Sequence, residues 1–262
     1  MIFQNGQLLT RTYNSRTTKW LSFLIFKESI GYNRNMKKNN LKLAILGLVL
    51  ALMLGSYFTL DYFGFIPHKV YSSRDFGIAY IDSGKDFDND GIEDFQDILE
   101  GAQLDAKNRP HYKSAYYSGG YPPENEGVCT DLVWRAFFNA GYILKDYVDE
   151  DIINHQEKYT QMGPVRDPNI DFRRVKNLMV FFENNSESLT TDLNSIEDWQ
   201  AGDIVIFSDH HMGIVSDKRN KKGIPYLIHN ASQPNREENT LERWAKKGIS
   251  GHYRWHGYNT RK

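Results

Sequence analysis

A single cysteine, Cys129, is the residue of this chain best suited to nucleophilic chemistry, because a deprotonated thiol attacks carbonyl carbon readily. A helix is predicted directly after it by apolar residues at helical spacing, namely Leu132, Val133, Ala136, Phe137 and Ala140. Gly141 can end this helix. At a helix start, unpaired N–H groups and the helix dipole favour the thiolate form of Cys129. The alternative is a buried cysteine that acts only as a small apolar residue.

A base for this thiol is predicted further along the chain. Residues 204–207 and 211–216 have strand patterns, and a third strand pattern, 224–231, follows a polar turn. Strands joined by so short a turn pair antiparallel. His211 and His229 are therefore expected on neighbouring strands of one sheet.

The length of the turn sets which side chains oppose each other. With a turn centred on Asn220, His211 lies directly opposite His229, with Cβ atoms about 5 Å apart on one face. A change of one residue in the loop brings Asn230 opposite His211 instead. Since either residue can orient an imidazole, the pattern predicts a nucleophile, a base and an orienting residue: Cys129, His211 and His229, with Asn230 as the alternative third member.

Two other uses of these histidines are open. His210 is a competing base, but it falls in the connection before the strand, whereas His211 begins the alternation with Gly213 and Val215. A zinc site on His210, His211 and His229 is also conceivable, although no carboxylate at metal-ligand spacing accompanies them. We therefore favour His211 as the base.

An acidic loop before the cysteine has the spacing of a calcium-binding loop. Residues 86–97 carry carboxylates at loop positions one, three, five, nine and twelve, and Gly91 at position six allows the sharp turn. The predicted ligands are Asp86, Asp88, Asp90, Asp94, Asp97 and the main-chain carbonyl of Ile92. Position twelve is aspartate instead of glutamate and no amphipathic helix precedes the loop, so the pattern predicts a structural Ca²⁺ in a loop with one following helix. The alternative is a solvated acidic turn.

The charged residues are distributed unevenly. Of 32 Lys and Arg and 33 Asp and Glu residues, eight basic residues but only one acidic residue, Glu28, lie in residues 1–60. The acidic remainder argues against a nucleic-acid partner. Residues 43–60 carry no charge, are long enough for a membrane helix and follow Lys37, Lys38 and Lys42, which predicts an uncleaved membrane anchor with the rest of the chain outside the cell. A secreted form, made by signal cleavage, is the alternative.

Five segments are predicted on these grounds. They are a basic cytoplasmic N-terminus at 1–42, in which Met36 is an alternative start, the anchor at 43–60, a spacer at 61–80, the calcium-type loop and helix at 81–104, and a catalytic domain at 105–258. An exported domain with one cysteine forms no internal disulfide, so Cys129 has no role in a structural disulfide bond.

With these residues in place, the stretch 115–255 resembles the NlpC/p60 group of papain-like cysteine peptidases, and more closely an uncharacterised bacterial branch of that superfamily. The resemblance rests on Gly-Val-Cys-Thr-Asp at 127–131, the Gly202-Asp203 turn, the strand that begins at His211, and Gly-His-Tyr-Arg at 251–254. It implies an α+β fold in which N-terminal helices, the cysteine helix among them, pack on an antiparallel sheet. It also implies that the tyrosine three residues before a Gly-Gly pair, here Tyr116 with Tyr117 as the alternative, polarises the scissile carbonyl.

The resemblance further implies a hydrolase. The expected activity is that of an extracytoplasmic cysteine amidase or endopeptidase that uses Cys129, His211 and His229 on peptidoglycan stem peptides and needs no organic cofactor. Two other functions are compatible with the same residues. One is a thiol acyltransferase on the same fold, and the other is a calcium-dependent wall-binding module in which the three residues are inert.

Overall fold

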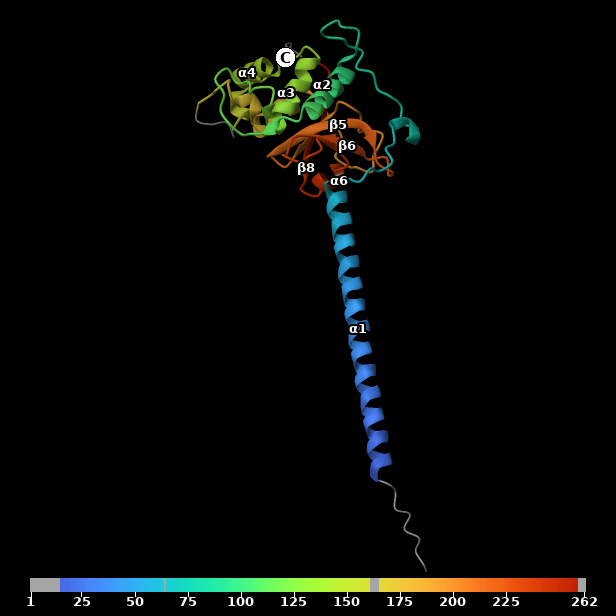
Figure 1. Ribbon diagram of the computed structural model, residues 1–262. Coiled ribbons are helices and arrows are strands. Elements are labelled where there is room, and N and C mark those ends of the chain that lie inside the picture. Colours follow the sequence, from blue (N-terminus) through green and yellow to red (C-terminus); the bar gives the residue numbers. More distant parts are fainter. Residues whose placement is uncertain (1–14, 64, 161–164, 259–262) are drawn as a thin grey trace, which may run out of the picture. The chain divides into compact units, whose positions relative to one another are not determined.

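The protein is described here by a computed structural model, which covers residues 15–63, 65–160 and 165–258 (Figure 1). Residues 1–14, with which the predicted basic N-terminus begins, lie outside the described residues. The chain divides into two compact units, residues 1–61 and 62–262. The division comes one residue after the end of the predicted anchor.

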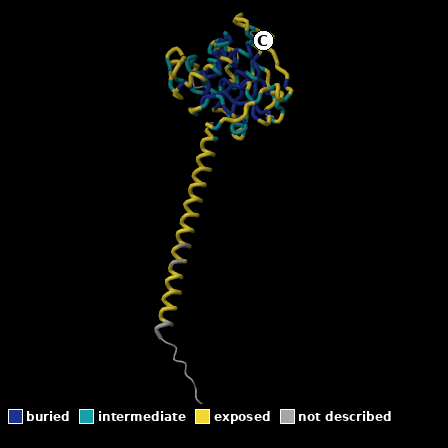
Figure 2. Tube along the Cα trace, turned by 45° about the vertical axis from the view of Figure 1, so that its right-hand side comes forward, coloured by how far each residue is buried: buried dark blue, intermediate teal, exposed yellow. Residues whose placement is uncertain are grey.

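The described part of the first unit is one long helix, α1 (Ser15–Tyr62), whose last residue belongs to the second unit. Its large apolar side chains between Trp20 and Leu60 are exposed, as Figure 2 shows by colour. The stretch Lys19–Tyr62 includes a window of mean hydropathy 2.2, so it is long and apolar enough to cross a membrane, and a signal sequence near an N-terminus has the same properties. The apolar helix predicted at 43–60 is therefore present, as a candidate anchor or signal sequence.

The second unit combines helices with an antiparallel sheet (Figure 1). Its α-helices are α2 (Asp94–Asn108), α3 (Cys129–Asn139), α4 (Leu144–Asn154), α5 (Val175–Asn185) and α6 (Leu241–Ala245). Short 3₁₀ helices lie at Ser73–Phe76, Gln156–Lys158 and Asp171–Arg173. The expected α+β class is thus confirmed.

The main sheet has the strand order β3-β8-β4-β5-β6-β7, and its neighbouring strands are antiparallel. The strands are β3 (Glu187–Ser188), β4 (Ile204–Phe207), β5 (His211–Arg219), β6 (Pro225–Ile228), β7 (Glu237–Glu238) and β8 (Ile249–Arg254). A separate parallel pair is formed by β1 (His111–Tyr112) and β2 (Glu126–Gly127).

Apolar residues cover both faces of the main sheet, because β4 and the first part of β5 are buried on alternate sides. One face packs in a cluster with α2 to α5 and contributes Ile204, Ile206, Met212 and Ile214. The opposite face packs in a cluster with α6 and contributes Val205, Phe207 and Val215. Helices α2, α3 and α4 accordingly lie over one side of the sheet, with α6 on the other (Figure 1).

Several local predictions are confirmed and others change. Helix α3 begins at Cys129, and Gly141, with φ of 76°, follows its end as predicted. The predicted strand 204–207 is confirmed as β4, whereas β5 continues beyond 216 to Arg219 and β6 ends at Ile228. Strand β8 was not predicted, and it lies beside β4 in the sheet.

The predicted spacer at 61–80 is part of the folded unit. Tyr71 and Arg219 exchange two main-chain hydrogen bonds, of 2.9 and 2.7 Å. The buried guanidinium of Arg219 also donates to Ser73 Oγ at 3.0 Å and to the main-chain oxygen of Gly223 at 2.6 Å. The spacer prediction is therefore wrong, because a single extended bridge leaves no periodic signal in the sequence.

Candidate active site

Cys129 is the first residue of α3, and 4% of it is exposed. Asp131 fixes this helix start, because its carboxylate accepts the main-chain N–H of Val128 at 2.7 Å and the indole N–H of Trp134 at 2.9 Å. Arg173 grips the same carboxylate with two hydrogen bonds, of 2.6 and 2.9 Å. The Asp that follows Cys129-Thr130 therefore has a positioning task, which sequence analysis did not assign to it or to Arg173.

The sulfur of Cys129 lies beside the start of β5. The main-chain N–H groups of Met212, Thr130 and Cys129 itself act on this sulfur by lowering its pKa. Ile228, the last residue of β6, pairs with Ile214 of β5. Strand β6 therefore ends before it would lie opposite Met212. The thiol therefore sits in the gap that the short β6 leaves, next to the residue that follows His211.

Burial raises the pKa of the Cys129 thiol to about 11, and the negative charge of Asp131 contributes to the rise. The N–H donors of Met212 and Thr130 lower the pKa but do not cancel the cost of burial. The helix start therefore favours the thiolate as predicted, but burial outweighs this contribution in the free protein. At neutral pH the sulfur carries its proton.

The two imidazoles meet as predicted, but in another register. Nε2 of His211 lies 2.9 Å from Nδ1 of His229, and both rings are buried. Ile214 pairs with Ile228, which places Gly213 instead of His211 opposite His229, so the predicted register is wrong by two residues. The register shifts between Val215 and Arg219, where the strand pair is irregular. A shift of two keeps both rings on the same face of the sheet, which is why they still meet.

Gly213 leaves the room that His229 needs. A Cβ atom at position 213 would lie 2.6 Å from the main-chain oxygen of Ile228 and 3.0 Å from Cβ of His229. Asn230, the alternative third member, has another task. Its Nδ2 donates to the main-chain oxygens of Gly127 at 3.2 Å and Pro110 at 3.4 Å, which fastens the loop before the cysteine.

His229 is connected in turn to Glu238 of β7. Nε2 of His229 lies 3.2 Å from Oε1 of Glu238, which also receives Nη2 of Arg243 at 3.4 Å. The amide nitrogen of Gln233 lies 3.1 Å from the same Nε2 and donates to the main-chain oxygen of His229 at 2.9 Å. Sequence analysis missed Glu238. The sequence feature that could have indicated it is the pair of glutamates, Glu237-Glu238, shortly after His229.

Helix α6 covers the hydrogen-bonded series of His211, His229 and Glu238. The Trp244 ring stacks on His211, with centroids 4.0 Å apart and planes 16° apart. Burial lowers the pKa of His211 to about 2 and that of His229 to about 3, and the charge of Lys247 lowers both further. Both rings are thus neutral at neutral pH. Nδ1 of His211 makes no hydrogen bond to any residue that the structure describes.

A cavity of about 440 Å³ opens beside His229. Its lining includes Gln233, Glu238, Arg243 and Trp244. Cys129 is not part of this lining. The open space therefore adjoins the imidazoles, while the thiol is covered.

The predicted tyrosines are engaged elsewhere. The hydroxyl of Tyr116 receives Nδ2 of Asn169 at 3.1 Å, and that of Tyr117 donates to Glu126 at 2.7 Å. Neither makes a hydrogen bond to Cys129 in the described part of the chain. Burial raises the pKa of a third tyrosine, Tyr112 of β1, and a negative charge on Cys129 would raise it further. Sequence reasoning missed it because β1 has only two residues.

Residues 99–255 match the family described as "Domain of unknown function (DUF1287)". The chain belongs to this family. The DUF1287 match includes Cys129, His211, His229 and Glu238, and it leaves the acidic loop 86–97 outside. The chain is also similar to "Uncharacterized protein YijF" of Escherichia coli (strain K12), with 36% identity over 168 residues, which are 60% of this chain and 80% of that protein. No solved structure matches the chain.

The acidic loop brings together three of its predicted ligands. Carboxylate oxygens of Asp86, Asp88 and Asp90 lie within 4.8 Å of one another, and among the described residues they are the only such group of possible metal ligands. The histidines considered for zinc form no such group there, and His210 is exposed, 3.4 Å from Asp209.

Asp94 differs from its prediction as a ligand. Its Oδ1 accepts the N–H of Phe87 at 2.9 Å, and its Oδ2 accepts the hydroxyl of Tyr142. Both oxygens are therefore engaged within the protein, and the residue fastens the loop to the turn after α3. Asp94, which is position nine of the loop, is also the first residue of α2, and its side chain bonds to the protein at this helix start.

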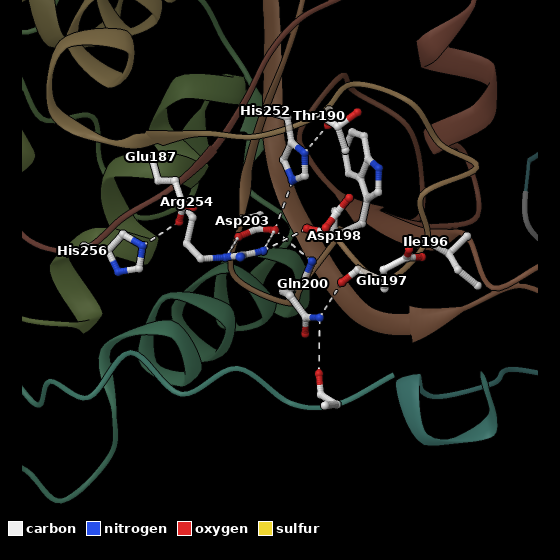
Figure 3. A network of polar contacts seen from close by, with 12 residues as sticks. Glu187, Thr190, Ile196, Glu197, Asp198, Gln200, Asp203, His252, Arg254 and His256 are labelled. Carbon is white, nitrogen blue, oxygen red and sulfur yellow. Dashed lines mark hydrogen bonds and ion pairs between the residues drawn. The ribbon is translucent and has the colours of Figure 1, made fainter. Parts of the chain in front are cut away.

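The Gly202-Asp203 turn and the end of the DUF1287 domain form one buried network (Figure 3). Asp203 accepts two hydrogen bonds from Arg254, of 2.8 and 2.7 Å, and lies 3.1 Å from Nε2 of His252. Gly202 has φ of 89°, and a Cβ there would lie 2.6 Å from the main-chain oxygen of Phe95. The two motifs thus hold β4 and β8 together and fix the strand that leads to His211.

Proposed function

We propose that the DUF1287 domain of this protein is a thiol-dependent amide hydrolase, with Cys129 as nucleophile and His211 as base. The observation that carries the proposal is the 2.9 Å contact between the rings of His211 and His229 at the start of β5, where the main-chain N–H of Met212 lowers the pKa of the Cys129 thiol. A thiol at a helix start, an imidazole at a strand start and a polar partner behind the imidazole are the groups expected of an NlpC/p60-type, papain-like peptidase.

The hydrogen bonds favour one arrangement of protons. A carboxylate can only accept, so Glu238 favours a proton on Nε2 of His229, while the Gln233 amide donates to the main-chain oxygen of His229. Nδ1 of His229 is then left as an acceptor. That Nδ1 then accepts a hydrogen bond from the Nε2–H group of His211. Nδ1 of His211 keeps its lone pair and can take the thiol proton. His229 and Glu238 are positioning residues in this scheme.

The reaction begins from neutral groups, since burial disfavours both the thiolate and the imidazolium. As the sulfur forms a bond with the amide carbonyl carbon, its proton passes to Nδ1 of His211. His211 then gives this proton to the leaving amine when the C–N bond breaks, and water hydrolyses the thioester. Tyr112 replaces Tyr116 as the candidate for polarising the carbonyl.

The proposed substrates are the amide bonds of peptidoglycan stem peptides. The support is the resemblance of the motifs to cell-wall peptidases, together with an apolar N-terminal helix that would hold an acidic domain outside the cell. We place the domain on the outer side of the membrane, as an anchored protein.

The test is digestion of purified muropeptides by the full-length protein in detergent, with calcium present and mass spectrometry of the products. We expect new amine and carboxyl ends from the wild type and none from Cys129→Ala. The same substitution should lower the melting temperature by only a few degrees, because it removes one buried atom. Turnover by Cys129→Ala, or the absence of cleavage by the wild type, would contradict the proposal.

A wall-binding module with an inert thiol is the second candidate, and the 4% exposure of Cys129 favours it. In that case the wild type and Cys129→Ala would bind sacculi equally and release no fragments. An acyltransferase would instead yield ligated products when a free amine is added to the digestion.

A further inference from the structure

Negative charge without a counterion gathers in the loop before α2. Asp86, Asp88 and Asp90 are exposed, and their oxygens lie within 4.8 Å of one another. None of the three forms an ion pair with a residue in the described ranges. Three carboxylates at this spacing repel one another in the absence of a cation.

The loop conformation is set by its own main chain. The carboxylate of Asp86 accepts the N–H groups of Asp90 at 3.1 Å and Gly91 at 2.9 Å. Gly91 has φ of 99°, which allows the turn after Asp90. Asp88 makes no side-chain hydrogen bond within the described chain, so its carboxylate is available to a ligand.

Asp97 provides an independent observation. It is 1% exposed, and its Oδ2 has no hydrogen-bond partner. A buried carboxylate without a partner is costly in a folded protein, and the charges of Asp86, Asp88 and Asp90 act on this one. A bound cation would remove both costs.

We propose that this loop binds one Ca²⁺ through Asp86, Asp88, Asp90, Asp97 and the main-chain carbonyl of Ile92. Every donor is oxygen, which is the preference of a hard divalent cation. Four carboxylates and a carbonyl, with water to complete the shell, suit the six to eight ligands that Ca²⁺ takes at flexible geometry. Mg²⁺ requires a stricter octahedron and keeps more of its water.

The site is built against the end of the cysteine helix. A Cβ atom on Gly141, just after α3, would lie 2.8 Å from Cβ of Asp88. Phe87 stacks on Tyr142 with ring centroids 4.3 Å apart, and Asp94 accepts the Tyr142 hydroxyl. Calcium therefore stabilises the packing of α2 on α3, the helix that carries Cys129 at its other end.

The experiment uses full-length protein in detergent after removal of metals with a chelator, and adds CaCl₂ alone. Calorimetry should show one site. The melting temperature should rise by about 5–10 °C when free calcium exceeds the dissociation constant a hundredfold. MgCl₂ at the same concentration should raise it by less than half as much.

Matched variants locate the site. Asp88→Asn removes one ligand without breaking a loop hydrogen bond and should weaken calcium binding about tenfold or more. Glu100→Gln also removes one negative charge, but on α2 one turn after Asp97, outside the proposed ligand set. The new amide oxygen can still accept the hydrogen bond from Gln96, and the affinity for calcium should stay within about twofold. Asp97→Asn should raise the melting temperature of the metal-free protein and abolish the calcium-induced rise.

Three results would overturn the proposal: no heat and no melting shift at millimolar calcium, equal affinity of Asp88→Asn and the wild type, or an equal effect of magnesium. All of these readouts are independent of amide hydrolysis. A failure of the calcium proposal is therefore distinguishable from a failure of the proposed enzyme.

Discussion

Two buried histidines, His252 and His211, lie on opposite flanks of β4 and are held in similar ways. Each stacks on a tryptophan, His252 on Trp199 at 3.8 Å and His211 on Trp244 at 4.0 Å between ring centroids. Around His252 both nitrogens have partners, since Nδ1 lies 2.7 Å from the main-chain oxygen of Thr190 and Nε2 lies 3.1 Å from Asp203. Around His211, only Nε2 has a partner among the residues that the structure describes.

The difference lies in the unused nitrogen. The His252 network is complete within the protein and has no capacity to accept a proton without breaking a bond. The His211 network ends at a nitrogen that has no partner among the described residues, at the strand end where the sulfur lies. Burial and aromatic stacking are common to both networks, so they do not mark a base by themselves. The open hydrogen-bonding position does.

The largest expected effect is on stability, from Asp203→Asn. This substitution removes the anion that pairs with buried Arg254, so the free energy of unfolding should fall by about 3–5 kcal/mol. The melting temperature should then drop by about 10 °C. Differential scanning fluorimetry of the full-length protein measures it, and muropeptide cleavage per folded molecule should be unchanged.

Glu187→Gln is the matched control for this variant. Glu187 lies 2.9 Å from His256 in a pair that is about half exposed (Figure 3). Because exposed pairs contribute little, its loss should cost less than about 1 kcal/mol. Equal destabilisation by the two substitutions would show that the Asp203 network is no more important than a surface contact.

A smaller effect is expected on catalysis from Glu238→Gln. The charge that holds the proton on His229 is lost, which corresponds to about 1.5–3 kcal/mol, or about 10- to 100-fold in kcat. KM should stay within about twofold, because Glu238 acts on His211 through His229. Muropeptide turnover at several substrate concentrations measures both quantities.

Glu237→Gln changes the neighbouring carboxylate and serves as the control. The Glu237 carboxylate accepts hydrogen bonds from Ser216 Oγ at 2.6 Å and from the Lys218 ammonium, and it forms no hydrogen bond with His229 in the described ranges. Its substitution should leave kcat within about twofold. If both variants lose activity equally, Glu238 has no specific part in orienting the imidazoles.

The smallest expected effect is the response of stability to mild acid. The pKa values of His211 and His229 are lowered in the folded protein, to about 2 and about 3, against about 6.5 in an unfolded chain. Below pH 6.5 the unfolded chain takes up protons that the folded protein refuses, so stability is greatest above pH 6.5 and falls as the pH drops. At pH 6 the two rings should cost about 1–2 kcal/mol relative to pH 8.

The measurement compares chemical denaturation at pH 8 and pH 6 for the wild type and the double variant His211→Gln/His229→Gln. The double variant should lose less stability on acidification, since it lacks both buried imidazoles. An identical loss in the two proteins would show that these rings do not resist protonation.

Local signals were sufficient for much of the fold. Apolar spacing after Cys129 predicted α3 and its end, and a short apolar run predicted β4. The pairing of β8 with β4 and the bridge of Tyr71 to Arg219 depend on residues far apart in the chain, so no local pattern indicated them.

The candidate site was predictable in its residues but not in its electrostatics. His211 and His229 were placed on one face because strand periodicity survives a shift of two residues. The raised pKa of Cys129 depends on the packing that buries it, which sequence spacing does not reveal. Glu238 reaches His229 only through the pairing of β7 with β6, which no local pattern indicated.

Position 213 has no tolerance for a larger residue. Even one methyl group would press on the main-chain oxygen of Ile228 at 2.6 Å, and no side-chain rotation relieves a clash with backbone. The strand would have to bow outward and carry the ring of His229 away from its neighbour. The two imidazoles can lie this close only because residue 213 has no Cβ atom. A Gly213→Ala protein would therefore keep every reactive group and still lose their alignment.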